Sequence, residues 1–405
     1  MIDRVFAALR SLFPPGGEDA AAQAAYERAV EAYFGTGQAL AFLKGRVALY
    51  ATLKALGIGP GDEVIVPGYT CWVVPGPVLF TGAKPVYVDI EPEFYTAPVE
   101  LYAEHITPRT KAILVQHTYG FAAQAAAVRR LADERGLAMI EDCCHSFGGR
   151  VDGRLLGTYG HAAFFSGQWN KPYSTGMGGM ALVHDAGLAE RLRALQASFP
   201  VPSRKKAFML AALLLVHELA IYPSTATLVT RIFQWLTNRG LILGSYSMDE
   251  FGTTLPANYT QRPCPVQCRI GQMEVSRIGD NIGRRHHAAR RYLAELPRLG
   301  YHVPPIPENW DTPIVRFPVR VANKAEALGK AASHGVEIGS WFECPLHPHE
   351  TNHEAYCYTY GSCPEGERAA AEVVNLPTHR RVSDRVIDKT LEFMQKVCRP
   401  AEPAR

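Results

Sequence analysis

Lys171 is the residue of this chain best placed to act as a nucleophile. It stands in a glycine-rich stretch between two apolar segments, and Trp169, Pro172 and Tyr173 flank it. Such flanks would desolvate the amine, and desolvation lowers the pKa of a lysine until its neutral form is usable at ordinary pH. A solvated surface lysine is the alternative for this residue taken alone.

A second chemical stretch ends in the carboxylates Glu141 and Asp142, which follow the apolar residues 138–140. Carboxylates at the end of a buried strand are costly unless they are paired or face a ligand. An aspartate here could hold the protonated ring nitrogen of a ligand. Taken alone, the motif is explained equally well by a helix cap or an ion pair.

The third stretch is centred on Gly45, which stands where a helix is predicted to begin. A glycine there exposes free backbone N–H groups at the positive end of the helix dipole, which suits a phosphate. A simple turn is the commoner reason for such a glycine, so this signal is weak alone.

Alternating helix and strand patterns position these three stretches. Short apolar strands between helices favour a parallel sheet covered on both faces, and such sheets bind ligands beyond the carboxyl ends of their strands. We predict strands over 63–67, 85–89, 111–116, 137–141, 162–166 and 179–184, and helices over 47–56, 73–81, 123–135 and 186–198.

The rest of the chain has a different texture. Residues 203–245 are helical and apolar with basic residues at intervals, and then come a helix over about 267–296, a strand over 314–319 and a helix over 383–397. These patterns predict three parts: an N-terminal helical segment (1–30), a large α/β domain (31–255) that carries the apolar insertion, and a small α+β domain (256–405).

Five short motifs follow one another in a distinctive order. They are Gly-Pro-Gly-Asp-Glu-Val-Ile-Val-Pro (59–67), Gly-Ala-Lys-Pro-Val-Tyr-Val-Asp (82–89), Ile-Thr-Pro-Arg-Thr-Lys-Ala-Ile (106–113), Glu-Asp-Cys-Cys-His-Ser (141–146), and Ser-x4-Lys (166–171) followed by Thr-Gly-x-Gly-Gly-Met (175–180). The order resembles the sugar aminotransferase family of fold-type I pyridoxal-phosphate enzymes (DegT/DnrJ/StrS type), over roughly residues 40–200 and 255–395. The resemblance implies a mostly parallel seven-stranded sheet between helices and a small C-terminal α+β domain.

The resemblance implies roles for three residues at the reacting centre. Lys171 matches the lysine that holds pyridoxal 5'-phosphate as a Schiff base. Asp142 matches the carboxylate that pairs with the pyridinium nitrogen and keeps it protonated, so that the ring acts as an electron sink. His145 matches a Gln or His beside the phenolic oxygen of the cofactor.

Four further residues match the family's phosphate site. Ser166 matches a hydroxyl that bonds the phosphate, and Gly45 and Arg46 stand where the family has Gly-Thr, whose backbone N–H groups bind it. Asn258 matches an asparagine that reaches the phosphate from the neighbouring subunit. The resemblance therefore implies a homodimer with shared active sites.

The implied activity is the transfer of an amino group to a nucleotide-linked keto sugar or a related cyclic ketone, in polysaccharide, glycan or secondary-metabolite biosynthesis. Glutamate or glutamine as donor displaces Lys171, whose freed amine then moves the proton and leaves pyridoxamine phosphate as the intermediate. Two rivals are a pyridoxal-phosphate-dependent sugar dehydratase and a non-catalytic sensor or scaffold. Some dehydratase relatives carry His in place of the lysine, so Lys171 favours amino transfer.

The sequence departs from the family pattern at three places. Arg46 replaces a small hydroxyl residue, and its guanidinium either adds a phosphate contact or points to solvent. The family's ring-stacking aromatic falls at Cys71 by count, and we take the adjacent Trp72 as the better candidate. Met177 stands where many members carry Glu. Weak candidates for substrate binding are Tyr69, His347 and Met177.

Composition excludes several classes of protein. Lys plus Arg number 42 and Asp plus Glu 39, a net charge of +3 that gives no case for nucleic acid as a partner. Nine cysteines, an odd number, indicate reduced thiols and a cytoplasmic protein rather than a disulfide framework. No metal is expected, because the Cys and His residues between 344 and 363 fit no zinc spacing.

Two amphipathic segments remain to be explained. Residues 1–13 lack the features of a signal peptide, and the apolar run 207–216 is too short to span a bilayer. For 1–13 we expect a helix docked on the protein body, and for 204–245 extra dimer or substrate-covering packing. The alternative is that both segments rest on a membrane surface, which would make the enzyme membrane-peripheral.

Overall fold

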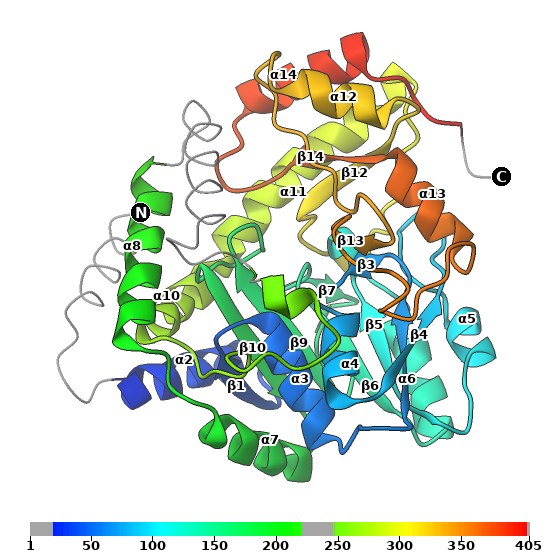
Figure 1. Ribbon diagram of the computed structural model, residues 1–405. Coiled ribbons are helices and arrows are strands. Elements are labelled where there is room, and N and C mark those ends of the chain that lie inside the picture. The colour runs from blue at the N-terminus through cyan, green and yellow to red at the C-terminus, as the bar shows by residue number, and fades with distance from the viewer. Residues whose placement is uncertain (1–18, 221–245, 247, 403–405) are drawn as a thin grey trace.

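A seven-stranded sheet runs through the lower half of the molecule (Figure 1). The structure is a computed structural model, and it describes residues 19–220, 246 and 248–402. The strand order is β1-β10-β9-β6-β5-β2-β4, and every neighbouring pair is parallel except those of β10, which runs against both β9 and β1. The predicted mostly parallel sheet is therefore confirmed. The strands are β1 (Gln38–Phe42), β2 (Glu63–Pro67), β4 (Lys84–Val88), β5 (Thr110–Gln116), β6 (Ala138–Asp142), β9 (Ala162–Gln168) and β10 (Met177–Val183).

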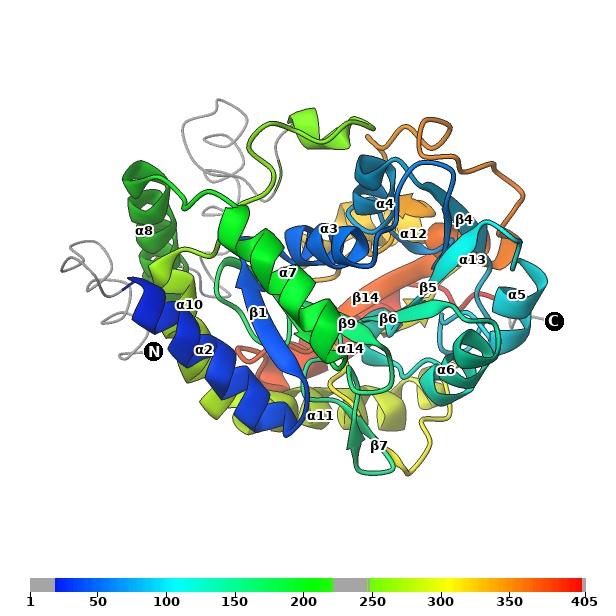
Figure 2. The same cartoon turned by 90° about the horizontal axis from the view of Figure 1, so that it is seen from below.

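Helices cover both faces of the sheet (Figure 2). Side chains alternate along a strand, so in β2 Val64 and Val66 face one helix layer and Ile65 faces the other. Burial on both faces explains why the strands read as continuous apolar runs. One layer is α3 (Gly45–Ala55), α4 (Pro75–Thr81) and α7 (Ala186–Ser198), and the other is α2 (Asp19–Phe34), α5 (Val99–Glu104), α6 (Ala125–Glu134) and α10 (Pro265–Ser276).

The predicted strands lie within two residues of the observed ones, but two features differ. The sheet has an additional strand, β1, which precedes the first predicted helix and pairs with β10. The helix expected over about 267–296 is two helices, α10 and α11 (Ile278–Glu295), which meet at Arg277. The chain turns there because α10 packs on α2, whereas the later part of α11 packs in a separate core.

That other core consists mostly of residues of the small C-terminal domain, and five aromatic or aliphatic residues of the large domain join it: Tyr69, Ile90, Tyr95, Tyr119 and Phe121. It contains the antiparallel pair β12 (Arg316–Arg320) and β14 (Val373–Pro377). Along α11, Ile278 and Ile282 pack with the large-domain cluster, whereas Ala288, Ala289 and Tyr292 pack in this other core, so the packing changes within α11 rather than at 256. The other helices are α12 (Lys324–Ala331), α13 (Pro364–Glu372) and α14 (Asp384–Val397).

The N-terminal segment expected over 1–30 is described only from residue 19. Helix α2 begins there and runs to Phe34, and Tyr26 and Val30 lie in the core of the large domain. The described part of this segment is therefore integral to the large domain.

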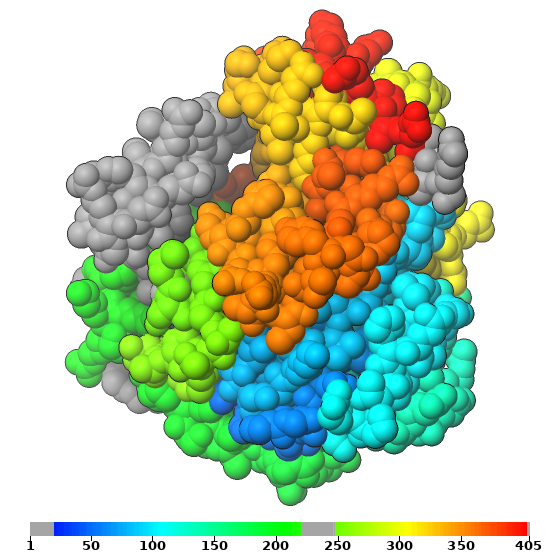
Figure 3. All heavy atoms as spheres, turned by 45° about the vertical axis from the view of Figure 1, so that its right-hand side comes forward, coloured from blue at the N-terminus to red at the C-terminus, as the bar shows by residue number. Residues whose placement is uncertain are grey.

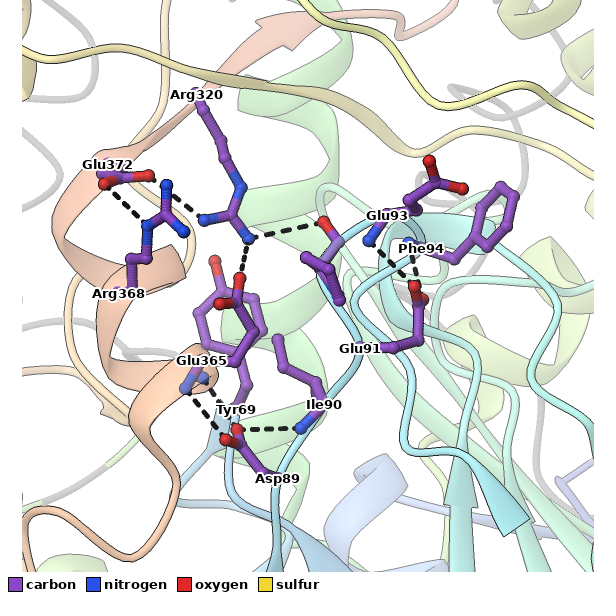
Figure 4. A network of polar contacts seen from close by, with 12 residues as sticks. Tyr69, Asp89, Ile90, Glu91, Glu93, Phe94, Arg320, Glu365, Arg368 and Glu372 are labelled. Carbon is purple, nitrogen blue, oxygen red and sulfur yellow. Dashed lines mark hydrogen bonds and ion pairs between the residues drawn. The ribbon is translucent and has the colours of Figure 1, made fainter. Parts of the chain in front are cut away.

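A helix cap links the small domain to the large one, and ion pairs within the small domain hold the capped helix (Figure 4). Arg320 on β12 pairs with Glu365 and Glu372 of α13. Asp89, just after β4, accepts hydrogen bonds of 2.8 Å from the backbone N–H groups of Glu365 and Gly366, at the positive end of α13. Figure 3 shows the segment around 340–370 (orange) lying directly on the early part of the chain (blue and cyan).

Helix α8 (Arg204–Ala220) is the described part of the predicted insertion. It buries Leu210 and Leu214 against the body but leaves Phe208 and Leu219 more than half exposed. None of the helices within the described ranges is long and apolar enough to cross a bilayer. All nine cysteines are free thiols, as expected.

Candidate active site

Helix α3 begins with an anion-binding geometry. Its N-cap residue, Lys44, makes no side-chain capping bond, so the first turn depends on another partner for its N–H groups. A Cβ on Gly45 would lie 3.0 Å from the Cβ of Ser166, and a Cβ on Gly179 would overlap the Lys44 backbone. The two glycines therefore let the helix start approach β9 and β10, which places the Ser166 hydroxyl beside it.

Lys171 lies just beyond β9 and faces the same region. Burial lowers the pKa of its amine, an effect that the thiol of Cys144 and the carboxylate of Asp142 oppose. The Nζ atom is 4.7 Å from the ring centroid of Trp341, and the backbone carbonyl accepts a 3.2 Å hydrogen bond from Arg285. The lysine is thus held with a lowered pKa, as a nucleophile requires.

Asp142 ends β6, next to Lys171. Its Oδ1 accepts the N–H of Cys144 at 2.9 Å, and burial raises its pKa although that hydrogen bond and Lys171 act against the rise. A buried carboxylate of this kind is stabilised by a cationic partner. It therefore suits a protonated ring nitrogen.

His145 is held as a neutral ring. Burial, together with the charges of Lys171 and Arg316, lowers its pKa well below the ordinary value. Its Nδ1 lies 3.0 Å from the backbone N–H of Tyr119, which donates to it. The proton of the neutral ring is then on Nε2, which makes that atom a hydrogen-bond donor.

Glu141 supports the loop from behind. Burial alone would raise its pKa, but hydrogen bonds from His117 and from the N–H groups of Gly157 and Gly160 bring it below the ordinary value. His117, Glu141 and Cys143 lie within 4.8 Å of one another, a spacing that could hold a metal ion. Both ring nitrogens of His117 and both oxygens of Glu141 are already hydrogen-bonded, so we assign this cluster to structure.

The two candidates for ring stacking point in different directions. Trp72 is 1 % exposed and packs in the core, stacked on Phe251 with ring centroids 4.5 Å apart. Cys71 is half-buried and lies in the electrostatic field of Lys171 and Asp142. This placement favours Cys71 over Trp72 as the residue beside a bound ring.

Arg46 and Lys44 share one carboxylate. Glu250, in η2 (Met248–Phe251), lies 2.8 Å from Lys44 Nζ and 2.7 Å from Arg46 Nε. Arg46 is 8 % exposed, so its side chain does not point to solvent, one of the two alternatives that the sequence left open. Burial and the neighbouring Arg46 lower the pKa of Lys44 to about 7.

The lowered pKa of Lys44 predicts a stability that rises with pH. Below pH 7 Lys44 is charged in both the folded and the unfolded chain, and the cost of burying its charge is fully present. Between pH 7 and 10.5 the folded chain gives up the proton first, and the cost is relieved. Replacing Lys44 by Gln should therefore raise the melting temperature at pH 7 and not at pH 10. Because the pKa falls from 10.5 to about 7 and each unit corresponds to about 1.4 kcal/mol, the stability difference between the variant and the wild type should change by roughly 3 kcal/mol between pH 7 and pH 10.

Melting curves of the wild type and Lys44→Gln at several pH values test this. Lys54→Gln, at an exposed position on the same helix, is the matched control and should show no such trend. A stability difference that is the same at pH 7 and pH 10 would contradict the prediction.

The weaker candidates are spread over several environments. Tyr69 is fully buried, and its hydroxyl is 2.7 Å from that of Tyr119. His347 is half-buried and pairs with Cys71 through the short β3 (Thr70–Cys71) and β13 (Leu346–His347) ladder. Met177 packs against Leu210 in an apolar cluster, and Asn258 is exposed.

The structure also brings two residues to Lys171 that sequence reasoning missed. Trp341 stacks on His145 with ring centroids 5.3 Å apart, and the Arg316 guanidinium carbon is 4.6 Å from the Trp341 centroid. A signal for Arg316 was present, because a charged residue inside the apolar strand 314–319 is unusual. Trp341 had no comparable signal.

Taken together, these residues fit pyridoxal phosphate. The uncapped start of α3 and the Ser166 hydroxyl suit a phosphate, the buried Asp142 suits a ring nitrogen, and Lys171 suits an aldehyde. His145 presents a donor near the same place.

Comparisons with known proteins agree with this chemistry. A sequence model described as the DegT/DnrJ/EryC1/StrS aminotransferase family matches residues 16–211 and 236–395. The intervening residues 212–235 fall inside the predicted apolar insertion.

Individual relatives span most of the chain. A dTDP-3-amino-3,4,6-trideoxy-alpha-D-glucose transaminase of Streptomyces venezuelae is 30 % identical over 92 % of this chain and 87 % of its own. A UDP-N-acetyl-3-dehydro-alpha-D-glucosamine 3-aminotransferase of Acidithiobacillus ferrooxidans is 29 % identical over 87 % and 82 %. The crystal structure of S. venezuelae DesV in complex with a ketimine intermediate aligns with a TM-score of 0.74 at 27 % identity, covering 98 % of this chain and 94 % of that one.

Proposed function

Since this chain belongs to the DegT/DnrJ/EryC1/StrS aminotransferase family, we propose that it uses pyridoxal phosphate to transfer an amino group from an amino acid to a keto sugar. Membership makes the chain an aminotransferase. Its cofactor, donor and acceptor are the parts that we propose.

One observation carries the proposal: Lys171, Asp142 and the uncapped start of α3 lie together at the end of the sheet where strands β9, β6 and β1 finish. The three come from different parts of the chain, after β9, at the end of β6 and after β1. Amine, carboxylate and anion site are the three groups that pyridoxal phosphate requires.

The bound cofactor would supply an electron sink for the bond broken at the donor carbon. Each residue then has a stated task. Lys171 Nζ moves the proton, since its lowered pKa leaves a neutral amine available, and Asp142 holds the positive ring nitrogen. His145 Nε2 would donate a hydrogen bond to the phenolic oxygen of the cofactor, and the α3 N–H groups with Ser166 would bind its phosphate.

The acceptor that we propose is a nucleotide-linked keto sugar or a related cyclic ketone, with glutamate or glutamine as donor. The two relatives described above support a nucleotide-linked sugar, because both are named for one. The dehydratase and the non-catalytic sensor are not favoured, since Lys171 is present and held beside Asp142.

A screen of donors against acceptors by mass spectrometry tests the proposal. Each keto sugar is incubated with glutamate or glutamine and the cofactor, and a product that gains an amine is sought. Failure of every nucleotide-linked keto sugar and cyclic ketone to gain an amine from either donor would overturn the proposed function.

We also propose a homodimer with shared active sites. Asn258 is exposed, while its neighbour Tyr259 donates a 3.2 Å hydrogen bond to the Arg46 carbonyl beside the phosphate site. Asn258 thus lies near a site and is free to reach a second copy. Sedimentation velocity measures the assembly, and a monomer that is fully active would contradict this part.

A cytoplasmic enzyme that touches a membrane surface is our proposal for the location. Phe208 is exposed beside the basic start of α8 and Leu219 is exposed near its other end, a pattern that suits an anionic bilayer surface. Segments 1–13 and 221–245, which also motivated this idea, lie outside the described residues. We expect flotation with vesicles of anionic lipid and none with neutral vesicles. Failure to float with either would reject membrane contact and leave dimer or substrate-covering packing.

A further inference from the structure

Arg316 is a cation for which the enzyme has no evident structural use. It begins β12, and the neighbouring Phe317 points into the small-domain core. Within the described residues the Arg316 guanidinium forms no hydrogen bond and no ion pair, and its contact is the ring of Trp341. Burial lowers its pKa, although Glu337 and Tyr119 oppose this. A half-buried cation without an anion costs stability, which a function can justify.

Arg316 and Lys171 approach the same aromatic ring. Their charged groups lie 4.6 and 4.7 Å from the Trp341 centroid, so both cations lie against one indole. The charge of Arg316 also contributes to the lowered pKa of both Lys171 and His145. Arg316 therefore belongs to the space around the reacting amine.

The backbone makes room for this guanidinium. A Cβ at position 339 would overlap Arg316 Nη1, so Gly339 is the residue type that leaves the space open. The segment that carries Gly339 is held by a reciprocal pair of 2.9 Å backbone hydrogen bonds to Asn375. The Arg316 head group thus lies against the Gly339 backbone.

Arg285, the other nearby arginine, differs in this respect. Its guanidinium donates to the carbonyls of Val315 and Lys171 and to Asn281. The hydrogen-bond donors of Arg285 are occupied in holding the Lys171 loop against the residue that precedes β12. Arg316 is left for a ligand.

We propose that Arg316 binds the carboxylate of the amino-acid donor, an inference that rests on the proposed function. A guanidinium binds a carboxylate through two parallel hydrogen bonds. Any α-amino acid carries a carboxylate next to the nitrogen that must reach the position of the Lys171 amine. An acceptor sugar need not carry one. Arg316 then selects amino acids as donors and orients the donor carbon.

Steady-state kinetics of Arg316→Gln and Arg316→Lys test this. In Arg316→Gln the KM for glutamate or glutamine should rise by roughly 10- to 100-fold, the effect of losing a hydrogen-bonded charged pair. The KM for the keto sugar should stay within about twofold of the wild-type value, since the sugar makes no such contact with Arg316 in this proposal. Arg316→Lys, which keeps the charge but loses the paired geometry, should lie between.

Binding of glutarate, a dicarboxylate without an amine, gives a readout that needs no turnover. Calorimetric titration of the holoenzyme should show binding by the wild type and a matching loss in Arg316→Gln. Arg298→Gln, an exposed arginine after α11, is the control and should bind as the wild type does. The melting temperature of Arg316→Gln should be equal or higher, because a buried charge is removed.

Unchanged donor KM and unchanged glutarate binding in Arg316→Gln would overturn the inference. So would an effect confined to the KM of an acidic keto sugar, which would place an acceptor carboxylate here instead. A wild-type enzyme that aminates no sugar would mean failure of the proposed function, a separate result. A variant that does not fold is recognised by its melting curve, and Arg316→Lys then provides the same comparison.

Discussion

Replacing Lys171 by Ala is expected to reduce amino transfer by about 10⁴-fold or more, the largest effect of any single substitution. In the function that we propose, one amine serves as the nucleophile toward the cofactor and then as the group that moves the proton. Burial lowers its pKa, so the neutral form that both tasks need is accessible. The rate is measured by following the aminated sugar, and the visible absorbance of the lysine-linked cofactor should be lost.

Cofactor affinity should fall far less than the rate, because the phosphate site is independent of Lys171. The start of α3 and the Ser166 hydroxyl lie on other elements and remain intact. Lys205→Ala, an exposed lysine at the start of α8, is the matched control and should be fully active. A Lys171→Ala protein that keeps both the rate and the absorbance band would refute the assignment of this lysine.

Asp142→Asn is expected to lower the rate by about 10²- to 10³-fold, the usual effect of removing one preorganised electrostatic group. The amide has the same shape, and its oxygen can still accept the N–H of Cys144. What is lost is the negative charge that, in the function that we propose, keeps the ring nitrogen protonated. The rate constant for the donor half of the reaction, measured in a single turnover, reports this loss.

The cofactor-free Asp142→Asn protein should be at least as stable as the wild type. Burial raises the pKa of Asp142, so ionising it in the empty site costs free energy that the amide avoids. Asp133→Asn, at an exposed position in α6, is the control for both measurements. If Asp142→Asn were markedly less stable and equally active, Asp142 would be a structural residue.

Local pattern was sufficient to predict most of the large domain. The strand over 63–67 is β2 and the helix over 186–198 is α7, residue for residue. The strand is short and apolar, and the helix begins directly after the capping residue Asp185. The limits of both elements therefore depend on residues that are close in sequence. The places of Lys171 and Asp142 at the ends of strands followed from the same pattern, whereas β1, the strand before Gly45, was not predicted.

Local sequence pattern could not predict which way each side chain of the site faces or which residues contact one another there. Cys71 and Trp72 are adjacent in sequence, but Cys71 lies near Lys171 and Trp72 lies in the core. The strand that carries Cys71, β3, pairs with β13, which is nearly 280 residues away along the chain. The shared carboxylate of Glu250 reaches Lys44 and Arg46 from some 200 residues away.

The sequence by itself determined the chemical groups and the strands that carry them, because periodicity and motif order are local properties of a chain. The tertiary structure decided which of those groups meet. Arg316 shows why: its charge is visible in the sequence, but its proximity to Lys171 and its lack of an ion pair among the described residues depend on how the small domain packs on the large one. Contacts between distant segments arise from packing of whole elements, which no local pattern encodes.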